Sequence, residues 1–302
     1  MAEHDRTTQA AAYLRMLLVR PGEPRSVWQK YAPDTPPAEI DVAAAAEVLA
    51  RHTGAERPVA ELTSAVRRAL DGTALDHQMV DLFIEAFQIT PRHAGRLRDL
   101  MRGSDSVRVI TGDVLPAPEL SEQSSPPGYE TLALHELHTL GPDGLPAEHQ
   151  TIQAIKSTVD RLESYPYRFD TDELVVEVIR GGRLGDRFYR LTETLFGVDI
   201  LLTPPLGRDE TALMHYRTTF LYHTAPEPEF RRGVMHSTKD ITIWVKFHPD
   251  RLPARVWSAR WDRIDHAQIV DQQVVELDDE FSVHSRFDAV EQAIVGFYWS
   301  WD

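Results

Sequence analysis

Cysteine is absent from this sequence of 302 residues. Disulfide bonds, thiolate nucleophiles and cysteine-ligated metal centres are therefore excluded. No apolar run approaches the roughly 20 residues that a membrane-spanning helix requires. The opening residues, MAEHDRTTQAAAYL, lack a signal-peptide pattern, so we expect a cytoplasmic protein.

Signatures of catalysis and phosphate binding are also missing from the sequence. It holds no Gly-x-Ser-x-Gly elbow, and Arg180-Gly181-Gly182-Arg183-Leu184-Gly185 lacks the glycine spacing of a phosphate loop, which predicts a hairpin turn instead. His135 and His138 lie three apart on an expected strand, so they should point to opposite faces rather than toward one metal ion. We therefore expect no enzyme activity, no cofactor and no metal site.

Lysine is scarce, and nearly all of the 32 basic residues are arginine. The net charge of −15 argues against non-specific binding to nucleic acid or to an anionic membrane. The acidity is uneven, however. Residues 1–110 hold about as many basic as acidic residues, so almost the entire negative charge falls on residues 111–302.

The first third of the chain has the apolar spacing of helices. Asp41 stands where an N-cap residue would precede an Ala-rich helix that ends at Gly54, and Asp76 stands before another helix. Thr90-Pro91 opens a last one, because proline fits the first turn of a helix. The helices are predicted over 7–19, 26–31, 42–52, 62–70, 77–87 and from Pro91 to Arg102.

Proline and serine then mark a linker over 112–128, between a helical domain at 1–111 and a β domain at 129–302. The predicted fold class is α + β in separate domains, with an antiparallel immunoglobulin-like β-sandwich at the C-terminus. Residues 151–162 fit either a helix or a strand, and 288–293 a short helix. Strands are predicted over 129–140, 174–180, 198–203, 212–223, 241–247, 256–261, 270–277 and 296–301.

Residues 240–262 form the centre of the predicted β domain. Ile241, Ile243, Val245 and Phe247 alternate with polar or exposed positions, as on a half-buried strand. Pro249 and Pro253 then interrupt the ladder, and 256–261 is interpreted as the returning strand of the same pair.

Residues 65–90, AVRRALDGTALDHQMVDLFIEAFQIT, carry the most specific pattern in the chain. They resemble the second half of a lambda-repressor-like (XRE-type) helix-turn-helix, in which a recognition helix is followed by a glycine, a turn and a helix with an apolar ending. Val66 matches the buried recognition-helix position, Gly72 the glycine, and Ala86-Phe87-Gln88-Ile89 the ending.

This resemblance implies a transcription regulator that binds double-stranded DNA as a homodimer. Ser64, Arg67 and Arg68 would then face the major groove, since arginine is the best bidentate reader of guanine. The face of Arg92, Arg96 and Arg102 would hold phosphates, or else it would simply offset the helix dipole and Asp99. The alternative is a non-catalytic protein-interaction or adaptor protein in which the helical bundle is degenerate and does not bind DNA.

Aromatic clusters in the β domain offer a ligand or partner surface. Tyr165 and Tyr167 lie in one cluster and Tyr298 in the last strand, where alternation sends Phe297, Trp299 and Trp301 to the opposite face, into the core. The order of motifs in this part, with FHPDRLP late and GFYWSW last, is similar to the C-terminal domains of helix-turn-helix regulators of high-GC bacteria. Those domains have no characterised function, so the resemblance implies an architecture and no binding site. We expect this domain to sense a ligand or a partner.

Overall fold

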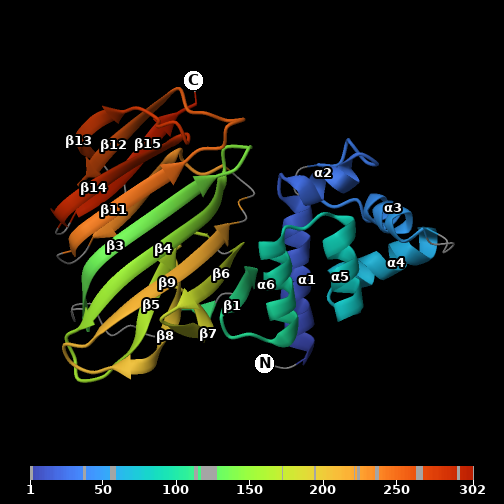
Figure 1. The fold of residues 1–302 in the computed structure, drawn as a ribbon, viewed down its shortest axis with the longest axis horizontal. Coiled ribbons are helices and arrows are strands. Elements are labelled where there is room, and N and C mark those ends of the chain that lie inside the picture. Colours follow the sequence, from blue (N-terminus) through green and yellow to red (C-terminus); the bar gives the residue numbers. More distant parts are fainter. Residues whose placement is uncertain are drawn as a thin grey trace. The chain divides into compact units, whose positions relative to one another are not determined.

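The computed structural model describes residues 3–36, 39–54, 59–111, 115–116, 128–171, 173–193, 195–220, 222, 225–234, 238–262, 268–290 and 293–301. The chain divides into two compact units, Met1–Thr111 and Gly112–Asp302. Helices and strands are both extensive, so the fold is α + β (Figure 1). The linker predicted over 112–128 lies outside the described residues except at 115–116 and 128. No helix in the described part of the chain is long and apolar enough to cross a membrane.

The first unit is helical. Its elements are α1 (Glu3–Val19), α2 (Glu23–Gln29), α3 (Val42–Thr53), α4 (Val59–Leu70), α5 (His77–Ala86), α6 (Pro91–Arg102) and the strand β1 (Val107–Thr111). Both predicted N-caps are confirmed: Ala44 N donates to Asp41 Oδ1 at 2.8 Å, and Met79 N to Asp76 Oδ1 at 2.7 Å. The core contains fully buried Trp28, Val66 and Phe83.

The second unit is built from strands. They are β2 (Leu115–Pro116), β3 (Tyr129–Leu140), β4 (Pro146–Ser157), β5 (Leu162–Phe169), β6 (Glu173–Arg180), β7 (Gly182–Arg190), β8 (Phe196–Leu206), β9 (Thr211–Phe220), β10 (Glu229–Val234), β11 (Thr238–Lys246), β12 (Arg255–Trp261), β13 (Ile269–Val275), β14 (Ser282–Val290) and β15 (Ala293–Ser300). Residues 151–162 are therefore mostly strand. The helix predicted over 288–293 is wrong, because β14 pairs with β11 as far as Val290.

These strands form three sheets. A long sheet has the order β6-β9-β4-β3-β11-β14, the β15 sheet has the order β10-β15-β12-β13, and the β8 sheet has the order β2-β7-β8-β5. The expectation of purely antiparallel strands is wrong, because β11 runs parallel to β3 and β2 parallel to β7. Parallel neighbours require a crossover connection, and here the chain between β3 and β11 passes through strands of all three sheets.

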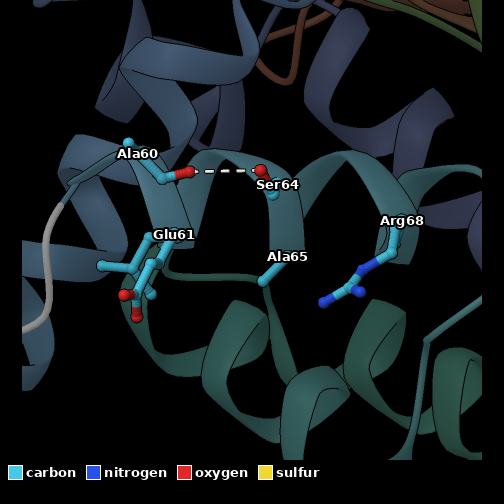
Figure 2. Close-up of a pocket in the computed structure, with 6 residues that line it drawn as sticks. Ala60, Glu61, Ser64, Ala65 and Arg68 are labelled. Carbon is cyan, nitrogen blue, oxygen red and sulfur yellow. Dashed lines mark hydrogen bonds between the residues drawn. The ribbon is translucent and has the colours of Figure 1, made fainter.

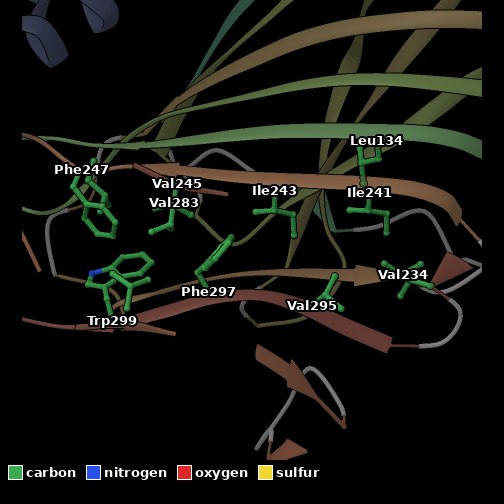
Figure 3. Packing of buried hydrophobic residues seen from close by; sticks show 13 residues of the cluster. Leu134, Val234, Ile241, Ile243, Val245, Phe247, Val283, Val295, Phe297 and Trp299 are labelled. Atoms are coloured by element: carbon green, nitrogen blue, oxygen red, sulfur yellow. The ribbon is translucent and has the colours of Figure 1, made fainter. Parts of the chain in front are cut away.

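The long sheet and the β15 sheet face each other across a shared apolar core (Figure 3). Ile241, Ile243 and Val245 of β11 point toward Val295 and Phe297 of β15, and all five side chains are fully buried. The prediction that residues 256–261 return beside β11 and pair with it is therefore wrong. β12 pairs with β13 and β15, in the opposite layer, because Pro249 and Pro253 lie where the chain crosses from one sheet to the other.

A glycine pair makes a second crossing between sheets. Gly181 has φ 95°, which favours glycine, and a Cβ on it would meet the carbonyl oxygen of Leu213 at 2.7 Å. The predicted hairpin turn is wrong, since β6 pairs with β9 while β7 pairs with β8. The glycines instead let the chain leave the long sheet and enter the β8 sheet.

Candidate functional sites

The proposed recognition helix, α4, packs beside the well-capped α3. α3 ends at Gly54, whose left-handed φ of 58° stops the helix and whose N–H bonds to Ala50 O. Residues 55–58, between the two helices, lie outside the described residues. α4 buries Leu62, Val66 and Ala69 against its neighbours, which leaves its opposite side in solvent.

The exposed side of α4 carries three predicted DNA-contacting residues, Ser64, Arg67 and Arg68. Ser64 Oγ donates to Ala60 O at 3.2 Å, one turn back on the same helix (Figure 2). Neither guanidinium has an ion-pair partner among the described residues. Both side chains are therefore available to an external acceptor.

Acidic residues lie near both arginines. Arg68 and Ser64 line a shallow hollow of about 460 Å³ that also includes Glu61 (Figure 2). Arg67 lines a second hollow of about 730 Å³, whose walls include Asp34, Glu39 and Asp41. The surface is therefore mixed in charge rather than uniformly basic, which disfavours purely electrostatic attachment to a polyanion.

Two of the predicted phosphate contacts on α6 differ in exposure. Arg92 is exposed, whereas only 2% of Arg96 is exposed, and its Nη1 donates to Tyr13 OH at 3.3 Å. The prediction that Arg96 contacts phosphate is therefore wrong. Tyr13 OH also bonds to His93 Nδ1 at 2.5 Å, so Arg96 completes a polar contact between α1 and α6. Burial raises the pKa of Tyr13, although the charge of Arg96 opposes that rise.

The three predicted surface tyrosines do not share a face. Tyr165 and Tyr167 are each only 4% exposed and lie in the interior, where Tyr167 OH bonds to Thr218 Oγ1 at 2.6 Å. Tyr298 instead lies on the outer face of the β15 sheet, stacked on Trp257 with 4.7 Å between ring centroids. Grouping them as one ligand surface was wrong, because β5 turns its tyrosines inward. The predicted burial of Phe297 is confirmed.

A buried polar layer, undetected in the sequence, lies on the inner face of the long sheet beneath β10. We define the polar layer as Glu136, His138, His149, Thr151 and Arg232. Strand register places Glu136 opposite Thr151 and His138 opposite His149, so these four side chains share one face of the β3–β4 pair. Arg232 reaches them from β10, with its Nη1 3.0 Å from Glu136 Oε1.

The charges in this layer are held by short contacts. Glu136 has no exposed side-chain surface and lies 3.4 Å from His149 Nε2, which in turn is 3.1 Å from Thr151 Oγ1. Burial alone would raise the pKa of Glu136, but Arg232 and His149 outweigh it and leave that pKa lowered. Burial also lowers the pKa of Arg232, an effect that Glu136 more than reverses, so the pair is ionised.

His138 is held in the layer by ring contacts rather than by hydrogen bonds. It is 4% exposed, and neither ring nitrogen has a hydrogen-bond partner in the described structure. Its ring stacks on Phe230, with 4.7 Å between centroids, and Phe230 also stacks on His149 at 4.9 Å. Burial, helped by His149, holds the pKa of His138 well below 6.5, so this imidazole is neutral at physiological pH.

The layer is chemically an ion pair between the buried carboxylate of Glu136 and the partly buried guanidinium of Arg232, with neighbouring imidazoles. The described residues contain no group of three or more His, Asp or Glu side chains arranged to hold a metal ion, and the cation beside Glu136 is already Arg232. His135 is exposed while His138 is buried, so the predicted opposite orientation is confirmed. Two signals could have revealed the layer: the two-residue spacing of Glu136 and His138, and the turn at Gly141–Gly144 that aligns His149 with His138.

Comparisons with known proteins identify no family. No family model matches the chain, and no curated protein matches it. Among solved structures, one similar chain is a "putative protease" from Parabacteroides distasonis, with 11% sequence identity and a TM-score of 0.38. The match covers 58% of this chain and 41% of that one, so this chain spans less than half of that protein. Similarity at this level carries no functional argument.

Proposed function

We propose that this protein is a DNA-binding transcription regulator in which α4 enters the major groove and the β unit senses a ligand or partner. The observation that carries the proposal is the solvent-facing side of α4. There Ser64, Arg67 and Arg68 lie on a helix anchored against α3, and neither arginine has an ion-pair partner among the described residues. Such a helix can present two guanidinium groups to base edges.

Electrostatics define the kind of binding to expect. The chain carries a net charge of −15, so long-range attraction to DNA is weak. Affinity must then come from local contacts, with Arg67 and Arg68 at the bases and Arg92 at a phosphate. Each phosphate that is neutralised adds about −0.9 to the slope of log K against log salt.

The test is a salt titration on the full-length protein. Duplexes enriched from a random pool by the protein itself would be titrated by fluorescence anisotropy. We expect Arg67→Ala and Arg68→Ala each to cost about 1–3 kcal/mol on the selected site and to relax preference at a single position. Arg92→Ala should instead weaken all duplexes alike and reduce the salt slope by about one.

Arg102→Ala is the matched control. Arg102 is also an exposed arginine of the helical unit, but it is paired with Asp99 at 2.7 Å in the last turn of α6. It should leave affinity unchanged. The proposal fails if no duplex is enriched at low salt, or if Arg102→Ala weakens binding as much as Arg67→Ala.

A non-catalytic interaction protein is the second candidate, favoured by the outer face of the β15 sheet. Trp257 and Tyr298 are both partly exposed there, and the Arg255 guanidinium lies 5.8 Å from the Trp257 ring centroid. Partly exposed aromatic and arginine side chains are enriched in protein interfaces. This function would be supported if the protein bound no DNA in any test above but did bind a protein partner. Trp257→Ala should then abolish binding of that partner.

A further inference from the structure

β10 lies at one edge of the β15 sheet, and its only strand neighbour among the described residues is β15. Its inward side chains are Phe230, Arg232 and Val234, of which Val234 lies in the apolar core shared with the long sheet (Figure 3). An edge strand has fewer contacts to break than a central strand, so it can move while the rest of its unit stays folded. The contacts of Phe230 and Arg232 therefore decide whether β10 stays docked.

Both of these side chains rest on titratable groups of the polar layer. Phe230 stacks on two imidazoles, with 4.7 Å between its ring centroid and that of His138 and 4.9 Å to that of His149. Arg232 Nη1 lies 3.0 Å from Glu136 Oε1. The docking of β10 is therefore coupled to the charge of the layer beneath it.

The groups around His138 determine how the layer responds to acid. Apart from His138, the titratable groups of this region come from five strands: Glu136 on β3, His149 on β4, Tyr165 and Tyr167 on β5, Tyr216 on β9 and Arg232 on β10. The facing positions of β11, Ile243 and Val245, are aliphatic. Burial raises the pKa of Tyr167 and that of Tyr216 above 10, so both phenols are neutral. The permanent charges of the region are thus one carboxylate and one guanidinium, which already form an ion pair.

A proton on His138 finds no partner in this arrangement. Neither ring nitrogen has a hydrogen-bond partner in the described structure. The Glu136 carboxylate is already engaged by Arg232 at 3.0 Å and lies 3.4 Å from His149. The face of the Phe230 ring attracts a cation, but one phenyl ring offsets only a small part of the cost of burying a charge. Water can solvate the protonated imidazole once β10 moves away, so acid favours the undocked strand.

We propose that β10 is a proton-released strap: protonation of His138 lifts Phe230 and Arg232 off the long sheet while the rest of the β unit stays folded. The proton is then an effector that the β unit senses directly. This inference does not rest on the proposed DNA binding, and its test uses no DNA.

Linkage gives the size of the effect. The docked strand holds the pKa of His138 well below 6.5, whereas water around the lifted strand returns it toward that ordinary value. Docking is therefore strongest above pH 6.5 and weakens as pH falls from 6.5 toward the docked-state pKa. The ratio of lifted to docked protein should rise by up to about 25-fold between pH 7 and pH 5.

Hydrogen exchange of the full-length protein tests the strap, read by mass spectrometry and corrected for the intrinsic pH dependence of exchange. Peptides covering β10 should lose at least about tenfold of their protection between pH 7 and pH 5, whereas peptides covering β4 and β9 should keep theirs. Equal loss in all three strands would show that the unit unfolds as a whole. No loss in β10 would show that the strand stays docked, and either result overturns the proposal.

Substitution of His138 identifies the responsible group. His138→Phe keeps a planar ring that takes up no proton, so the acid-induced loss in β10 should shrink to less than about threefold. His138→Gln, which also does not titrate in this range, is a second variant with a smaller, polar side chain. His135→Phe is the matched control, because His135 lies on the same strand with its side chain exposed on the opposite face, and it should keep the full loss. Full loss in a folded His138 variant would refute the proposal.

The absence of cysteine allows a second measurement. Val234→Cys places a single thiol on the inward face of β10, where the side chain is 5% exposed. Its rate of labelling by a maleimide would be compared with that of Val234→Cys/His138→Phe at the same pH, so that thiol ionisation cancels. The ratio of the two rates should rise about tenfold from pH 7.5 to pH 5.5. A ratio that does not change with pH would contradict the release of β10 by His138.

Discussion

Arg232→Met is the sharpest perturbation of the β unit, because it removes the cation beside Glu136 while keeping most of the side chain's bulk. Glu136 has no exposed side-chain surface, and its carboxylate is 3.0 Å from Arg232 Nη1. Removing one partner of a buried pair leaves an uncompensated charge, which costs about 3–5 kcal/mol. Replacing both partners is far less costly, so Glu136→Gln/Arg232→Met should recover most of the loss.

Urea unfolding followed by tryptophan emission would measure this effect. Trp28 lies in the helical unit, whereas Trp244, Trp257, Trp261, Trp299 and Trp301 lie in the β unit, so the signal reports mainly on the latter. With an m-value of about 2 kcal/mol/M, the Arg232→Met midpoint should fall by about 1.5–2.5 M.

Arg208→Met is the control, because Arg208 also pairs with a carboxylate, Asp160 at 2.9 Å, but on the surface. Exposed pairs contribute little, so its midpoint should barely move. The reasoning is refuted if Arg232→Met and Arg208→Met shift the midpoint equally, or if the double variant is as unstable as Arg232→Met.

Two further predictions concern other buried polar groups. The folded-state pKa of His138 lies well below 6.5, so the folded β unit favours the neutral imidazole. The stability of the unit is therefore lost as pH falls from about 6.5 toward the folded pKa, by up to about 1.4 kcal/mol per pH unit. His138→Phe should flatten this acid dependence in urea midpoints measured from pH 7 to 5. If the slope is unchanged, the acid dependence arises from other groups. Arg96→Leu should destabilise the helical unit by about 1–3 kcal/mol in thermal melts followed by helical circular dichroism, through lost bonding to Tyr13. It should leave the DNA salt slope unchanged below the melt, and a reduced slope would restore Arg96 as a phosphate contact.

Local signals allowed the helical unit to be predicted closely. Caps such as Asp41 and Asp76, and the stop at Gly54, act within one turn of the helix, so the sequence contains both partners of the contact. Arg96 was the failure, because its burial depends on Tyr13, more than eighty residues earlier. Nothing near Arg96 in the sequence distinguishes it from exposed Arg92.

Many strand positions were also predictable, but β5, β7, β10 and β14 were missed, and strand partners were not predictable. Alternation placed β11 and β12, and prolines correctly marked the break between them. Turn residues show where a strand ends; whether the next strand pairs with it or joins another sheet depends on distant segments. At Pro249–Pro253 and at Gly181–Gly182 the chain crosses from one sheet to another, although the residues alone would equally fit a turn between paired strands.

The candidate site was predicted in part. Exposure of Ser64, Arg67 and Arg68 followed from the apolar spacing of α4. The polar layer did not follow, because Glu136 looks like a solvent-facing residue until β10 brings Arg232 over it. Buried charges are rare without partners, and here the partner lies almost a hundred residues away.

Rows of aliphatic side chains on neighbouring strands can pack in more than one alignment of the strands, whereas the polar layer fits only one alignment. If β11 slid along β3 by two residues, Ile241, Ile243 and Val245 would still present aliphatic groups to the same core, so that contact selects poorly among alignments. The same displacement between β3 and β10 would move Glu136 about 6.7 Å from its place beside Arg232. A misaligned chain would then bury a lone carboxylate, so we expect the ion pair to contribute less to net stability than to rejection of slipped sheets during folding.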